Sequence, residues 1–420
     1  MSRAPLRGTM LSALELPAAR PPGHRRFLAD VGPLYAANGF IGFVFAASGP
    51  LAIILSVGTR GGLSPAELAS WVFGVFCING LITLGMSWAY REPLCFFWTI
   101  PGTVLVGPAL QHLSFAEVIG AFYATGVLIL VIGASGWVRR AMQAVPMPIV
   151  MGMVAGVFLR FGLDLVRALH DDLSIAGPMV AAFLLLSALP RLGRRMPPLI
   201  GALLTGAVVV ALLGRVGGAS LGGFALVRPV VQAPAWSLGA MVELVVPLAI
   251  TVLVVQNGEG IAVLQAAGHK PPINAVTLLC GIGSLLAATV GAVSSCLTGP
   301  TNALITHSGE RNRHYTAAMV TGGLAIAFGL LAPAFTGLML ATPKAYIMTL
   351  GGLAMLRVLQ GSFIASFRER FSLGALVSFL VTVADLAVLN IGAAFWGLIA
   401  GFAVSWLLER QDFTTRVEGA

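Results

Sequence analysis

The stretch Trp98-Thr99-Ile100-Pro101-Gly102-Thr103 interrupts an apolar segment with a proline, a glycine and two hydroxyl side chains. A similar stretch, Leu297-Thr298-Gly299-Pro300-Thr301-Asn302, interrupts an apolar segment in the second half of the chain. Paired interrupted segments of this kind are typical of the substrate-binding region of secondary transporters. Nearly the same spacing separates Arg160 from Arg357. The sequence therefore predicts an internally duplicated membrane protein.

The composition supports this interpretation. Hydrophobic residues make up 57% of the chain, charged residues only 10%, and the mean hydropathy is +0.92. Such a chain has too little polar surface to cover a water-soluble globule. Apolar runs of about 20 residues, long enough to cross a bilayer as a helix, recur along most of the sequence. We therefore expect an all-α polytopic membrane protein.

We place about fourteen membrane spans, in two repeats of about seven each. The segments are 35–57, 66–89, 95–110, 115–136, 146–168, 174–190, 198–214, 236–257, 273–291, 296–306, 315–340, 345–366, 371–388 and 390–408. The third and tenth are too short to cross as plain helices, and they carry the two interrupted stretches. Because each repeat holds an odd number of spans, the second repeat is expected to be inverted relative to the first.

The arginines orient these spans. If the amino terminus is cytoplasmic, most Lys and Arg residues fall on the cytoplasmic side, and only Arg60, Arg215, Arg228 and Lys344 fall outside. This positive-inside bias predicts that both termini are cytoplasmic. It also accounts for the net charge of +9, so no nucleic-acid partner is expected. The expected organisation is a cytoplasmic tail (1–30), a first repeat (31–215), a linker (216–235), an inverted second repeat (236–409) and a cytoplasmic tail (410–420).

Motifs for ATP-driven pumping or enzymatic chemistry are missing from the sequence. The two lysines, Lys270 and Lys344, do not follow a glycine, so the phosphate-binding loop of a nucleotide-driven pump is absent. His269, His307 and His314 fall at predicted cytoplasmic ends, where we expect them to be solvated. We expect no enzymatic activity, metal or cofactor, and a proton gradient as the energy source. The expected partners are a small-molecule substrate and the lipid bilayer, and a homodimer is left open.

Acidic residues inside a bilayer are costly, and each is a functional candidate by default. The candidates are Asp164, Glu243, Glu259 and Asp385. Asp164 lies one turn from Arg160, so an intrahelical pair would explain it, and Glu243 lies near a span entrance in contact with solvent. Glu259 stands between two glycines, just after the amide pair Gln256-Asn257. We predict that Glu259 carries the coupled proton; a solvated carboxylate at the helix end is the alternative.

Arg160 and Arg357 occupy matching positions in the two repeats. Each could pair with an anionic substrate or with carbonyl groups inside the bundle. Their matching positions favour a structural role where the repeats meet.

The last span carries the most distinctive motif of the chain, Ile391-Gly392-Ala393-Ala394-Phe395-Trp396-Gly397-Leu398-Ile399-Ala400-Gly401. Other notable stretches are Leu159–Leu163, Gln256-Asn257, Gly260-Ile261-Ala262, Ala266-Ala267-Gly268, Gly361-Ser362 and Phe379–Thr382. Together they resemble the benzoate:proton symporter family of bacterial inner membranes. The resemblance covers most of the chain after the amino-terminal tail.

The resemblance implies the inverted-repeat fold of nucleobase transporters, in which a core domain (spans 1–4 and 8–11) moves against a gate domain (spans 5–7 and 12–14). Arg160 and Arg357 would then lie in the gate domain. It also implies proton-coupled transport of a small aromatic carboxylate such as benzoate. The substrate would lie between the broken third and tenth spans, whose helix amino termini attract a carboxylate, and the eighth span. The implied substrate-binding residues are Thr99, Pro101, Gly102, Gln256, Asn257, Thr298, Gly299, Thr301 and Asn302.

Differences from the family pattern keep other substrates open. Val255 stands where the family has serine, Glu259 is unusual after the amide pair, and Ser294–Pro300 departs from the usual tenth span. A neutral nucleobase-like solute is the main alternative, because an amide pair and a glutamate can bond to the edge of such a ring. A passive anion channel on the same fold is a further alternative, which uncoupled currents would reveal.

Overall fold

The computed structural model describes residues 14–17, 21–138, 140, 146–189, 191, 196–215, 225–306, 309–368, 370–386, 388 and 393–414. Outside this set lie most of the amino-terminal tail, the first part of the linker and the last residues of the chain. His307 lies outside it too, so the expectation for this residue is not addressed. Within it the chain is mostly helical. Two strands of three residues each, β1 (Phe96–Trp98) and β2 (Ser295–Leu297), stand out from the helices.

The helices of the first half follow the predicted spans closely. They are α1 (His24–Asp30), α2 (Pro33–Ala46), α3 (Gly49–Arg60), α4 (Pro65–Phe73), η2 (Gly74–Ile78), α5 (Asn79–Tyr90), α6 (Ile100–Ala109), α7 (Phe115–Ser135), α9 (Met147–Asp171), α10 (Leu173–Ala188) and α12 (Pro198–Leu212). The starts of α4 and α7 carry the same local signal. Ser64 and Ser114 each form a capping box with the glutamate three residues later, which satisfies the first backbone N–H groups of the helix.

The second half holds the remaining helices. They are α13 (Leu238–Ala240), η3 (Met241–Val245), α14 (Val246–Ile250), η4 (Thr251–Gln256), α15 (Asn257–Ala266), α16 (Ile273–Thr289), α17 (Gly299–Ile305), η5 (Arg311–Arg313), α18 (His314–Leu330), α19 (Ala332–Leu340), α20 (Lys344–Phe367), α21 (Ser372–Ala384), α22 (Ala393–Leu408) and α23 (Arg410–Thr414). The segments from α13 to α15 form one continuous helix with two π-helical stretches, η3 and η4. Such stretches are frequent at functional sites.

Several helices are long and apolar enough to cross a membrane. The structure has 6 of them, Pro33–Arg60, Pro65–Tyr90, Phe115–Ser135, Met147–Asp171, Leu238–Ala266 and Lys344–Phe367, and the number is 7 if Arg311–Leu330 and Ala332–Leu338, bent by 74°, form one span. Shorter apolar helices of 10–17 residues include α6, α10, α12, α16, α21 and α22. The described residues therefore form a helical, multi-pass membrane protein.

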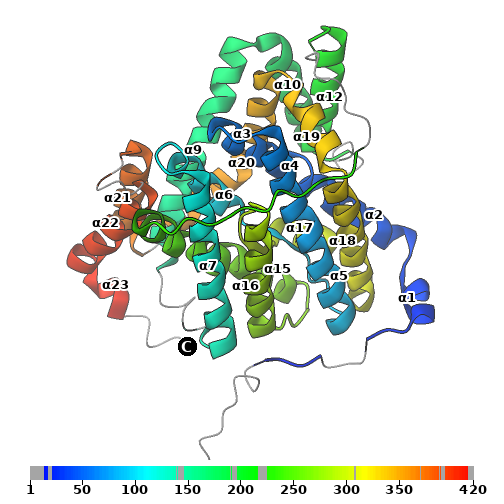
Figure 1. Cartoon of the computed structure of the whole chain (residues 1–420), viewed down its shortest axis with the longest axis horizontal. Coiled ribbons are helices and arrows are strands. Elements are labelled where there is room, and N and C mark those ends of the chain that lie inside the picture. The colour runs from blue at the N-terminus through cyan, green and yellow to red at the C-terminus, as the bar shows by residue number, and fades with distance from the viewer. Residues whose placement is uncertain are drawn as a thin grey trace, which may run out of the picture.

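The helices pack in two groups (Figure 1). In the first, which we call the long-helix group, α9 packs along α20, and α10, α12, α21 and α22 pack against this pair. In the second, the strand group, α7 packs along α16, and α18 packs against both α2 and α5. β1, β2, α6 and α17 also lie in the strand group, as do α3, which packs against α6, α4 and α2, and η4 and α15, which pack against β2 and α17. The two groups meet where α3 contacts α20 and where α6 contacts α9.

The described part of the predicted linker crosses the strand group as extended chain (Figure 1). The backbone N–H groups of Val227, Gln232 and Ala235 donate to carbonyl groups at the ends of three helices. Their acceptors are Leu330, Thr289 and Ala116, at distances of 2.9, 2.9 and 2.8 Å. This segment is therefore bonded to the helices along its length.

The two strands pair with each other, although they lie far apart in the sequence. Phe96 stands opposite Leu297 and Trp98 opposite Ser295 in an antiparallel ladder. The residues that precede α6 thus pair with the residues that precede α17, and because the strands are antiparallel the two helices begin at opposite ends of the ladder. The two interrupted stretches of the sequence therefore meet in the interior of the protein.

Candidate functional site

A cavity of about 880 Å³ lies between the two helix groups, and we call it the wide cavity. The strand group contributes Pro101, Gln256, Glu259 and Pro300, and the long-helix group contributes Arg357. Most other lining residues are apolar, among them Phe45, Met151, Val154, Phe158, Phe183, Leu186, Val255 and Leu353. An apolar cavity with a few polar groups is the usual form of a small-molecule site.

Glu259 is exposed to this cavity from the first turn of α15. It makes no hydrogen bond or ion pair with any residue that the structure describes. The Glu259 side chain packs against Gly299 at the start of α17. A Cβ added at Gly299 would lie 2.3 Å from the carboxyl carbon of Glu259. Any side chain larger than hydrogen at position 299 would require this carboxylate to move.

The two glycines beside Glu259 do not interrupt the helix. α15 runs without interruption from Asn257 to Ala266, and Glu259 lies well before its end. Gly260 instead permits close packing, because a Cβ there would lie 2.6 Å from the carbonyl oxygen of Leu297 in β2. The irregular part of this span is η4, which ends at Gln256.

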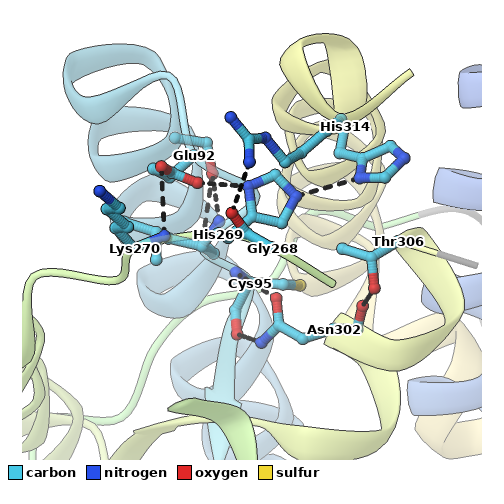
Figure 2. A network of polar contacts seen from close by, with 11 residues as sticks. Glu92, Cys95, Gly268, His269, Lys270, Asn302, Thr306 and His314 are labelled. Atoms are coloured by element: carbon cyan, nitrogen blue, oxygen red, sulfur yellow. Dashed lines mark hydrogen bonds and ion pairs between the residues drawn. The ribbon is translucent and has the colours of Figure 1, made fainter. Parts of the chain in front are cut away.

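The amides of Asn302 and Asn257 bond to the edges of the strand ladder. Asn302 accepts from the backbone N–H of Cys95 (3.1 Å) and donates to the carbonyl group of Cys95 (3.1 Å) (Figure 2). It also donates to the carbonyl group of Thr298 (2.6 Å). Asn257 accepts from the backbone N–H of Leu297 (2.8 Å). Backbone groups in a membrane interior must bond within the protein, and a two-stranded ladder leaves both of its edges open. These two residues therefore support the site, and neither is among the residues that line the wide cavity.

Thr99 and Gly102 also lie in the supporting structure. The Thr99 hydroxyl accepts from the backbone N–H of Gly102 (3.1 Å), which caps α6, and it donates to the hydroxyl of Thr251 (3.0 Å). Thr298 and Thr301 line a small pocket of about 20 Å³ that shares Gln256 with the wide cavity. Of the predicted substrate-binding side chains, Pro101 and Gln256 line the wide cavity itself.

Arg160 and Arg357 both lie in the long-helix group, on α9 and α20, but they face different cavities. Arg357 lines the wide cavity and donates to Gln360 (3.1 Å). Arg160 forms an ion pair with Asp385, at the end of α21. The expected pair between Arg160 and Asp164 is therefore wrong.

Asp164 and Glu243 also have partners that the sequence did not reveal. Asp164 pairs with Arg60 (2.5 Å) and Arg167 (3.2 Å). Glu243 is 5% exposed and contacts His112 (2.9 Å), so the expectation of a solvated carboxylate at this position is wrong. Arg167 lies three residues along the same helix, whereas Arg60 lies on another helix and His112 in a connecting segment, where spacing along one helix gives no signal.

His269 and His314 were expected to be solvated, and the structure shows instead that both are buried. The Nδ1 atom of His269 lies 2.5 Å from a carboxylate oxygen of Glu92, and its Nε2 atom lies 3.0 Å from Nδ1 of His314 (Figure 2). The contacts join the segment after α5, the connection between α15 and α16, and the start of α18. Among the described residues, no group of three or more His, Cys, Asp or Glu side chains is arranged to hold a metal ion.

Solved structures with a similar fold are anion transporters by their titles. The transmembrane domain of a cyanobacterium bicarbonate transporter, BicA, has a TM-score of 0.56 and 15% identity, and the match covers 91% of this chain and 99% of that one. Murine Slc26a9, an anion transporter in the inward-facing state, has a TM-score of 0.62 and 11% identity, with 98% of this chain and 77% of that chain covered. At these identities the likeness shows the fold alone.

Sequence comparisons identify closer relatives. The inner membrane protein YdcO of Escherichia coli (strain K12) is 32% identical over 380 residues, which are 89% of this chain and 95% of the relative. The benzoate membrane transport protein of Acinetobacter baylyi is 26% identical over 377 residues, which are 88% of this chain and 94% of the relative. The family model for benzoate membrane transport proteins matches residues 29–407. The chain therefore belongs to the benzoate membrane transport protein family.

Proposed function

We propose that this protein is a secondary active transporter that carries a small aromatic carboxylate, such as benzoate, together with a proton across the inner membrane. The observation that carries the proposal is the wide cavity, where Glu259 and Gln256 face an apolar space that also holds Arg357. The name of the Acinetobacter baylyi relative supports benzoate as the substrate.

The lining of the cavity suits an aromatic acid. Phe158, Phe183 and Val255 offer apolar surface to a ring, and the Arg357 guanidinium can pair with a carboxylate. A substrate carboxylate beside an ionised Glu259 would be repelled in this poorly solvated space. Substrate binding therefore favours the protonated form of Glu259, and proton binding favours the substrate, which is the thermodynamic requirement for symport.

The proposed transport cycle is alternating access by two inverted repeats. In this scheme the shorter apolar helices also cross the membrane, which gives about fourteen spans with both termini in the cytoplasm. The strand group would act as the core domain and the long-helix group as the gate domain. The equivalent strand–helix units, β1 with α6 and β2 with α17, support the duplication.

A neutral nucleobase-like solute is the second candidate. Gln256 and Glu259 lie one turn apart on the same helix and both line the cavity, so they can offer a donor and an acceptor to the edge of a ring. This arrangement does not use the charge of Arg357.

Substrate counterflow in proteoliposomes is expected to be inhibited by benzoate and substituted benzoates. Benzamide, which has the same ring without the charge, is the matched control and is expected to compete at least about tenfold more weakly, because a site that pairs with a carboxylate rejects the neutral analogue. The measurement is exchange of labelled benzoate against each unlabelled compound. Competition by nucleobases alone would favour the second candidate, and currents without exchange would indicate a channel.

A further inference from the structure

A second cavity, of about 270 Å³, lies at the opposite end of α6 from the wide cavity, and we call it the narrow cavity. The wide cavity contacts Ile100 and Pro101 at the start of α6. The narrow cavity contacts Val104, Leu105, Gly107 and Pro108 in the second half of α6, and Gln111 just beyond it. Gly102 and Thr103, between the two sets of residues, are buried. α6 therefore separates two cavities that both lie where the helix groups meet.

An ion pair joins the two helix groups beside the narrow cavity. Arg60, the last residue of α3 in the strand group, donates to one carboxylate oxygen of Asp164 on α9 in the long-helix group (2.5 Å). Arg167 donates to the other oxygen (3.2 Å). The Asp164 side chain is only 7% exposed. Charged hydrogen bonds that are partly removed from water are among the stronger polar contacts in proteins.

A second ion pair in the same cavity does not join the groups. Arg160 on α9 pairs with Asp385 at the end of α21, and both belong to the long-helix group. Relative movement of the two groups would break the Arg60–Asp164 pair and leave the Arg160–Asp385 pair intact. The narrow cavity thus contains one ion pair that depends on contact between the groups, Arg60–Asp164, and one that does not, Arg160–Asp385. The second pair serves as a control for the first.

We infer that the Arg60–Asp164 ion pair is the gate that holds the transporter closed at the narrow cavity. The inference rests on the proposed alternating-access function. In the structure, the space between the helix groups is large at the wide cavity and small at the narrow cavity. The opposite state of the transport cycle, with the narrow cavity open, requires the two groups to separate where Arg60 of α3 meets Asp164 of α9. Because the pair exists only while these helices are in contact, its free energy favours the state in which the narrow cavity is closed.

Thiol accessibility in membrane vesicles tests the gate without any substrate. Val104→Cys places a reporter in the narrow cavity and Ser187→Cys places one in the wide cavity. The native cysteines, Cys77, Cys95, Cys280 and Cys296, are buried, and the parent chain measures their background. Adding Asp164→Asn is expected to raise the labelling rate of the narrow-cavity reporter about tenfold and to lower that of the wide-cavity reporter, because opening one side closes the other.

The matched control is Asp385→Asn, which breaks the ion pair inside the long-helix group and is expected to leave the ratio of the two labelling rates unchanged. If Asp164→Asn fails to fold, Arg60→Gln removes the same contact from a helix end. Unchanged labelling at both reporters, or faster labelling at both, would overturn the gate whatever the substrate proves to be.

Discussion

Replacing Glu259 by glutamine is expected to abolish proton-driven accumulation of substrate while exchange of substrate across the membrane continues. Glutamine has the size of a protonated glutamate, so the cavity keeps its shape and its substrate-bound state. It cannot release a proton, so the step that couples transport to the gradient is lost. Uphill uptake driven by an acid exterior and counterflow at equal pH, measured in the same proteoliposomes, separate the two activities.

Glu259→Asp is the control for this variant, since it keeps an ionisable group in the first turn of α15 and is expected to retain part of the coupled uptake. A solvated carboxylate without a role in coupling predicts near-normal accumulation by the glutamine variant. Full uphill uptake by Glu259→Gln would therefore remove Glu259 from the coupling step. Asp385, or an ion other than the proton, would then be the next candidate.

Replacing Asn302 by leucine is expected to prevent stable folding rather than to weaken substrate binding. The Asn302 amide makes three hydrogen bonds to the backbone of Cys95 and Thr298, all buried. Leucine would leave these groups unpaired in the membrane interior, where each costs about 1–3 kcal/mol. The expected result is a large loss of folded protein, measured by size-exclusion chromatography and thermal unfolding in detergent.

Gln256→Leu is the contrasting variant, because Gln256 lines both the wide cavity and the small pocket. Among the described residues, the side-chain contact of its carbonyl is a long one from the Cys296 thiol, at 3.9 Å. We expect this variant to keep a Tm close to that of the parent and to show a higher apparent substrate constant. A normal Tm for Asn302→Leu, together with a raised substrate constant, would instead place Asn302 in the substrate site.

The helical membrane architecture could be predicted from the sequence because it depends on the length of apolar segments, a property of the local chain. The family could be predicted because its motifs, such as Gln256-Asn257, are also local. The roles of Asn257 and Asn302 depend on which strands pair. Neither the ladder of β1 and β2 nor the exposed backbone groups at its edges can be read from either segment alone.

Charge partners were hard to predict for the same physical reason. Spacing along α9 favoured a pair between Arg160 and Asp164, since residues four apart share a helix face. Packing of α9 against α21 and α3 instead brings Asp385 and Arg60 within reach, and these tertiary partners replace the local one. His269 and His314 were assigned to solvent because they lie at span ends, but the connecting segments fold onto one another and bury both rings.

Measuring whether protons move together with the substrate is the most direct test of proton symport. Proteoliposomes with a pH-sensitive dye inside, and no initial pH gradient, are given benzoate outside at a pH well above the pKa of the acid. Protein-free vesicles measure the passive entry of undissociated benzoic acid. Proton symport through Glu259 predicts internal acidification faster than this background for the parent protein, and background acidification with intact counterflow for Glu259→Gln. Rapid benzoate entry through the parent protein without acidification above background would contradict proton symport.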